Sequence, residues 1–147
     1  MDAGVGDSFE IPVIDAGGSR GGSSASWSLT LTKPAPHLVS LTLTSVGGQT
    51  WEGIGGDVFD ALMSLRSKVE PDRVQLCCNG ARRNAWSSGM QRDMGEGYGT
   101  YILPDQRSRE RPPEVPTLDA APPSEVVTVA EQRAWHKAWL AQALPEA

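Results

Sequence analysis

The sequence contains few of the residues that most often perform catalysis or bind metals. It has only two histidines, His37 and His136, which lie far apart, and only two cysteines, Cys77 and Cys78, which are neighbours. Neither pair matches the ligand spacing of a zinc site. The Gly-Lys-Ser/Thr signature of a phosphate-binding loop is also absent. We therefore expect no metal ion, no cofactor and no catalytic residue.

The sequence also lacks a long hydrophobic run. No run approaches the ~18–20 apolar residues that a membrane span requires. Residues 1–4 have neither the basic flank nor the apolar segment of a signal peptide. Adjacent cysteines in a strand point to opposite faces, so Cys77 and Cys78 are a poor disulfide pair. These features predict a reduced, cytoplasmic protein that does not contact a membrane.

Positive charge is scarce and concentrated in one segment. The net charge is −5, yet residues 73–92 contain Arg73, Arg82, Arg83 and Arg92 and no acidic residue. An acidic chain is poorly suited to neutralise phosphates, so nucleic acid is not the expected partner. It is better suited to meet another protein by electrostatic steering.

The hydrophobic pattern predicts an α+β fold. Residues 26–32 and 38–44 alternate apolar and hydroxyl side chains on either side of a Pro-containing segment, which indicates a hairpin. Pro12 places the first strand at a sheet edge. Asp57 is a suitable N-cap for an amphipathic helix. We expect a mixed, mostly antiparallel sheet of about five strands (8–15, 26–32, 38–44, 73–78 and 98–103) with helices 57–69 and 124–144 packed on it.

The sequence also predicts how two pairs of these elements are connected. The order of strand, helix and strand allows a right-handed crossover, with 38–44 and 73–78 parallel. The Gly-rich residues 46–56 are expected to form a turn.

Residues 1–103 are then the α+β core domain, 104–123 a proline-rich extended connector, and 124–147 a C-terminal helix on the same domain. Trp135 and Trp139 lie on one face of that helix, which packs on the sheet or, alternatively, on a partner.

Residues 79–97 are the predicted site. Ser87 or Ser88 can cap a short helix through Met94, and arginine side chains fork onto phosphate or carboxylate oxygens. Trp86 is expected to be exposed, because Trp and Arg dominate interface hot spots. Alternatively, the arginines pair with the acids of this chain. The predicted anion- or partner-binding residues are Arg82, Arg83, Asn84, Trp86, Ser88 and Arg92.

Two functions fit this pattern. The first is a small cytosolic protein-interaction protein, such as an adaptor, a regulator or an immunity-type protein, without catalytic activity. The alternative is an enzyme or ligand-binding domain that recognises a phosphorylated or carboxylated small molecule through the Arg-rich 79–97 loop. Single-stranded nucleic-acid binding through Trp86 and the arginines is favoured least, because the rest of the chain is acidic.

Overall fold

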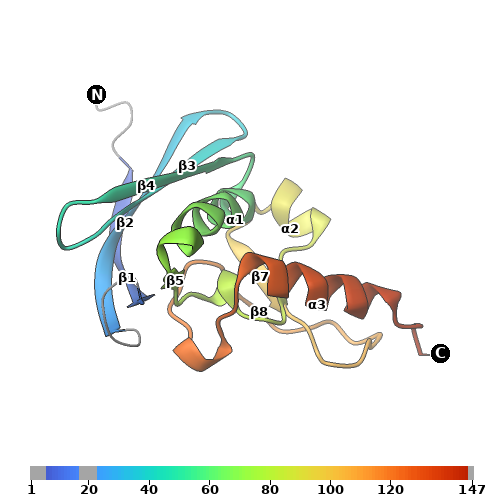
Figure 1. The fold of residues 1–147 in the computed structure, drawn as a ribbon. Helices are drawn as coiled ribbons and strands as arrows, with labels where there is room; N and C mark the ends of the chain where they lie inside the picture. The colour runs from blue at the N-terminus through green and yellow to red at the C-terminus, as the bar shows by residue number, and fades with distance from the viewer. Residues whose placement is uncertain (1–5, 17–22, 146–147) are drawn as a thin grey trace.

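The computed structural model describes residues 6–16 and 23–145, which form an α+β fold of two antiparallel sheets and three α-helices (Figure 1). The larger sheet has the strand order β4-β3-β2-β1-β5, and the smaller one β6-β7-β8. The elements are β1 (Asp7–Asp15), β2 (Ser23–Ala35), β3 (Leu38–Thr44), β4 (Thr50–Gly55), α1 (Val58–Val69), β5 (Val74–Leu76), β6 (Ala85–Trp86), α2 (Gly89–Asp93), β7 (Gly99–Ile102), β8 (Glu114–Pro116) and α3 (Val129–Ala141).

The predicted hairpin is confirmed as β2 and β3. Leu29 faces Leu43 and Leu31 faces Leu41 across this antiparallel pair, so the apolar side chains share one face of the sheet. All four leucines are buried. Because side chains alternate along a strand, the Ser and Thr residues between them form the opposite face.

α1 covers the apolar face of the sheet and begins as predicted. Asp57 is its N-cap and accepts a hydrogen bond from the Asp60 amide at 2.7 Å. The helix lies unusually close to β4, because a Cβ added at Gly53 or Gly55 would collide with the backbone of α1. These glycines therefore belong to a strand that the helix touches, and the expectation that 46–56 forms only a turn is wrong.

The connection after α1 also differs from the prediction. β5 does not lie parallel to β3; it pairs antiparallel with β1 at the other end of the sheet. Pro12 stands where this pairing begins, and its carbonyl accepts a hydrogen bond from the Cys77 amide at 2.8 Å. β1 therefore lies between β2 and β5, and the prediction that Pro12 marks an edge strand is wrong.

The predicted strand 98–103 forms as β7, but it belongs to the smaller sheet. It pairs with β6 on one side and with β8 on the other. β8 lies within residues 104–123, so the proline-rich segment includes a packed element. Thr117, just after β8, is fully buried and its hydroxyl is 2.6 Å from that of Thr100 in β7.

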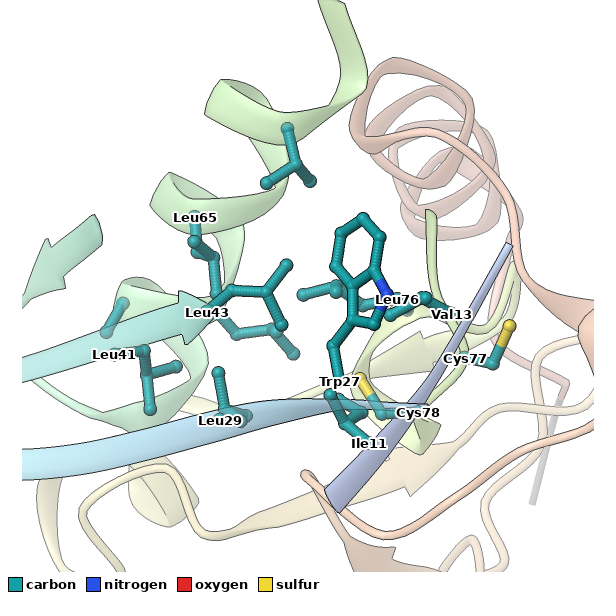
Figure 2. Close-up of a cluster of buried hydrophobic side chains, with 14 of the residues drawn as sticks. Ile11, Val13, Trp27, Leu29, Leu41, Leu43, Leu65, Leu76, Cys77 and Cys78 are labelled. Carbon is teal, nitrogen blue, oxygen red and sulfur yellow. The ribbon is translucent and has the colours of Figure 1, made fainter. Parts of the chain in front are cut away.

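One apolar cluster joins the large sheet to α1 (Figure 2). Its members come from β1, β2, β3, β5 and α1, and Figure 2 shows Trp27 among the aliphatic side chains. Trp27 stacks on Trp51 of β4 with ring centroids 5.6 Å apart. Cys77 and Cys78 are both free, and both are buried members of this cluster.

α3 is shorter than predicted. Its N-cap is Thr128, whose side chain and that of Glu131 form a reciprocal capping box, whereas Ser124 lies in a separate 3₁₀ turn. Val126, expected on the helix, precedes it and joins the main core. Among the residues that the structure describes, no helix has both the length and the apolar character required to cross a membrane.

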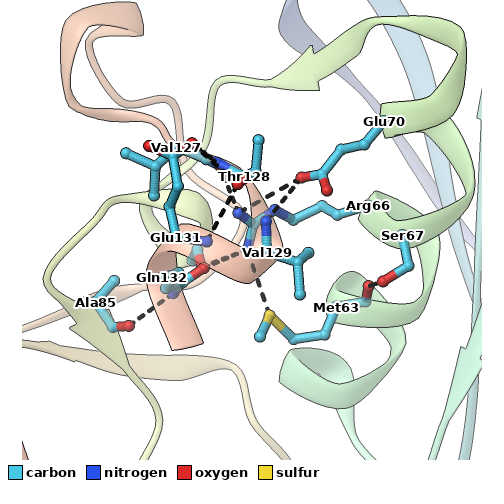
Figure 3. Close-up of polar contacts among 11 residues, drawn as sticks. Met63, Arg66, Ser67, Glu70, Ala85, Val127, Thr128, Val129, Glu131 and Gln132 are labelled. Carbon is cyan, nitrogen blue, oxygen red and sulfur yellow. Dashed lines mark hydrogen bonds and ion pairs between the residues drawn. The ribbon is translucent and has the colours of Figure 1, made fainter. Parts of the chain in front are cut away.

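A buried arginine joins α1 to α3 (Figure 3). Arg66 of α1 is 1% exposed and donates to the Gln132 side chain and, at 2.7 Å, to the Val127 carbonyl. Gln132 donates to the carbonyls of Gly80 and Ala85 at 2.9 and 2.7 Å. α3 is thus held on the same chain by a polar network.

Candidate functional site

Three arginines of the predicted site are occupied by acids of this chain. Arg82 lies 3.0 Å from Glu125, and Arg83 lies 3.7 Å from Asp105. Arg92 lies 2.9 Å from Asp57 and 3.7 Å from Asp60. These guanidinium groups reach different carboxylates. They do not converge on one anion site.

The remaining predicted residues also have structural contacts. Asn84 donates to the Leu103 carbonyl at 3.0 Å, and Ser88 is the N-cap of α2. Trp86, expected to be exposed, is half-buried between two rings. Phe59 meets it edge-on with centroids 5.3 Å apart, and His136 of α3 stacks on it at 4.0 Å.

Burial also shifts the pKa values of a histidine and of both cysteines. His136 is half-buried, its ring stacks on those of Trp86 and Trp139, and desolvation lowers its pKa. Desolvation raises the pKa of Cys78 to about 11 and also raises that of Cys77. A thiol that stays protonated at neutral pH is a poor nucleophile, so neither cysteine is a suitable catalytic group.

The feature that sequence reasoning missed is the outer surface of α2. Met90 is 72% exposed and Met94 is 78% exposed. The Met94 amide donates to the Met90 carbonyl at 2.8 Å, so the two residues are one helical turn apart on the same face. Tyr98, in the turn that follows, is 41% exposed. A Met-x-x-x-Met spacing in a short helix was the available signal in the sequence.

α2 is short, yet its neighbours fix its position. Ser88 and Gln91 form a capping box, and Gln91 also donates to Glu114 at 2.7 Å. On the opposite side, Arg92 bonds to the start of α1. Gly97 has a φ of +76°, and a Cβ there would lie 2.6 Å from the Phe59 amide nitrogen. The helix that carries the two exposed methionines is therefore held in a fixed position.

The charged groups around these methionines are mostly acidic. The α2 surface is defined here as Met90, Met94 and Tyr98 with the charged side chains in, or bonded to, residues 89–98. Its cations are Lys33 and Arg92, which bond to Glu96 and to Asp57 and Asp60 respectively. Two further carboxylates belong to it, Asp93 and Glu114, so the net charge of the surface is −3.

Two hollows lie near the predicted site. One, of about 440 Å³, borders α2 and is lined by His37, Gly56, Asp57, Gly89, Arg92 and Asp93. The other, of about 370 Å³, lies beneath the proline-rich segment and is lined by Asn84, Ile102, Leu103, Pro104, Ser108, Glu110, Arg111, Pro112 and Pro113. Within the described residues, no three His, Cys, Asp or Glu side chains gather as a metal site would require.

Comparison with known proteins gave no family for this arrangement. No protein-family model matches the chain. A search of curated proteins also gave no match.

Proposed function

We propose that this chain is a small cytosolic protein-interaction protein that binds its partner through the α2 surface. The observation that carries the proposal is the exposure of Met90 and Met94, one turn apart on a helix whose other faces are bonded to the body of the protein. Large apolar side chains gathered on a rigid, exposed element are typical of a protein-binding surface. Methionine is well suited to this role because its unbranched, polarizable side chain adapts to a partner.

The alternative, recognition of a small phosphorylated or carboxylated molecule, has less support. Arg82 and Arg92 already bond to carboxylates of this chain at 3.0 and 2.9 Å. A ligand would have to displace these acids and also compensate for leaving them unpaired. The α2 surface requires no such rearrangement before it binds.

Affinity capture from source-cell extract tests the proposal. The bait is the full chain, compared with Met90→Ser/Met94→Ser and with a control, Val46→Ser. Val46 is 86% exposed in the turn between β3 and β4, so the control also removes an exposed apolar side chain. We expect one partner at near-stoichiometric amount with the wild type and the control, and its loss with the double variant.

The proposal is wrong if no protein is enriched by the wild-type bait, or if the double variant retains the partner as well as the control does. Circular dichroism and thermal melting of each bait establish that it is folded. Both methionines point into solvent, so their replacement should leave stability within about 0.5 kcal/mol of the wild type.

A further inference from the structure

We infer that the partner segment recognised by the α2 surface is a basic amphipathic helix. This inference rests on the proposed function and adds the chemistry of the partner. It combines three observations: the apolar strip of Met90 and Met94, the acidic side chains around that strip, and the hollow beside α2.

The apolar strip matches the apolar face of a helix. Met90 and Met94 present two flexible side chains in a row along α2. Amphipathic helices bind through anchors at positions i, i+3, i+4 and i+7, which also form a narrow row. Methionine surfaces accommodate different aliphatic and aromatic anchors by changing rotamers. Two helices that cross with their apolar rows in contact would bury both methionines.

The negative charge around the methionines favours a partner segment with positive charge. Five carboxylates and two cations belong to the α2 surface, and both cations already contact carboxylates. Among the residues described, neither Asp93 nor Glu114 forms a salt bridge, and both are exposed. Lys and Arg at the edges of a bound helix would meet these carboxylates, whereas nucleic acids and anionic membranes have the wrong sign.

The hollow provides a specific place for one basic side chain. It opens beside Gly89 on α2, and its charged lining residues are Asp57, Arg92 and Asp93. Its volume of about 440 Å³ has room for the end of a Lys or Arg side chain. Asp57 already bonds to Arg92 and to the Asp60 amide, so the exposed carboxylate of Asp93 is the group that a basic side chain would meet there.

The test uses a defined probe, a labelled 18-residue peptide of Leu and Lys with Leu at helical spacing. Its controls are a Leu/Glu peptide with the same spacing and a scrambled Leu/Lys peptide that has no apolar face. Binding to the folded full chain is measured by fluorescence anisotropy. ¹³C-methyl NMR then locates the contact, because Met63 is buried and serves as an internal reference.

We expect the Leu/Lys peptide to bind and to shift the methyl signals of Met90 and Met94 but not that of Met63. Met90→Ser/Met94→Ser should weaken its binding roughly tenfold or more, since both anchors are lost. Asp93→Asn/Glu114→Gln should weaken it about threefold to tenfold and reduce its salt dependence. Glu110→Gln/Asp119→Asn, which removes the same charge outside the α2 surface, should have little effect.

The inference is overturned if the Leu/Glu or scrambled peptide binds as tightly, if the serine variant binds unchanged, or if the two charge variants are equivalent. These results are separable from those of the capture experiment. A partner that is captured in a Met90- and Met94-dependent manner while the Leu/Lys peptide fails to bind would leave the proposed function standing. It would show that the partner is not a basic helix.

Discussion

Arg66 offers the sharpest test of how α3 is held. Replacing it with Met keeps most of the aliphatic stem but removes the guanidinium group. The carbonyl of Val127 and the side-chain oxygen of Gln132 then lose their donor. Each buried acceptor left unpaired costs about 1–3 kcal/mol. Glu70, 4.0 Å from Arg66, also loses its cation but keeps its bond from the Val129 amide.

An opposing effect reduces this cost. Burial lowers the pKa of Arg66, which reflects the free energy spent in removing its charge from water. Arg66→Met removes this desolvation cost together with the charge. We therefore expect Arg66→Met to lower the free energy of unfolding by about 3 kcal/mol, near the low end for breaking a buried charged pair. For a chain of this size, this corresponds to a fall of about 6–12 °C in melting temperature.

Urea unfolding followed by tryptophan fluorescence measures the change. Arg133→Met is the matched control, because Arg133 is exposed on α3 and its replacement should change stability by less than about 0.5 kcal/mol. Arg66→Lys should fall between the wild type and Arg66→Met, since one ammonium cannot match the fork of the guanidinium. A loss below about 1 kcal/mol for Arg66→Met would refute the reasoning, because the bonds of Arg66 would then merely balance its desolvation.

Other predictions follow from burial and close packing. The lowered pKa of His136 favours its neutral form in the fold. Its contribution to stability is therefore present above pH 6.5, the ordinary pKa of histidine, and is lost as the pH falls through the folded pKa. The difference between the urea midpoints at about pH 7.5 and about pH 5.5 should be smaller for His136→Phe than for the wild type. Cys77 and Cys78 should resist Ellman's reagent in the folded protein and both react in urea; reaction of either in the native state contradicts this. Gly53→Ala should lower the free energy of unfolding by about 2–3 kcal/mol, because the added methyl group overpacks against α1. Gly89→Ala should leave it unchanged, because the added methyl group meets open space. Equal melting temperatures for the two variants would contradict the close approach of α1 to β4.

The sequence predicted the features that depend on local chemistry. Alternating leucines at 29, 31, 41 and 43 specify which face of the β2–β3 hairpin is buried, and the structure confirms it. Asp57 and Ser88 cap their helices because each side chain bonds to an amide three residues ahead. Such contacts need no knowledge of the rest of the chain, so they can be predicted from a short window.

The features that failed depend on contacts distant in sequence. Gly53 and Gly55 are typical of a turn in isolation, and only the approach of α1 explains them within a strand. β5 pairs with β1 and not beside β3, a choice that no local pattern encodes. For Arg82, Arg83 and Arg92, pairing with acids of this chain was one of the two expectations and it is confirmed, but their partners come from other segments, so the sequence could not decide between the two. In contrast, the capping box of Thr128 and Glu131 was visible in the sequence and marked where α3 begins.

The bond between Arg66 and Val127 also has a consequence for the order in which the protein folds during synthesis. The two residues are 61 positions apart, so at typical elongation rates about 3–12 s separate their appearance from the ribosome. Until then, the guanidinium group of Arg66 lacks the Val127 carbonyl and the Gln132 side chain that accept its hydrogen bonds. β1–β4 and α1, which pack on one another, therefore leave the ribosome well before the junction of α1 with α3 can form.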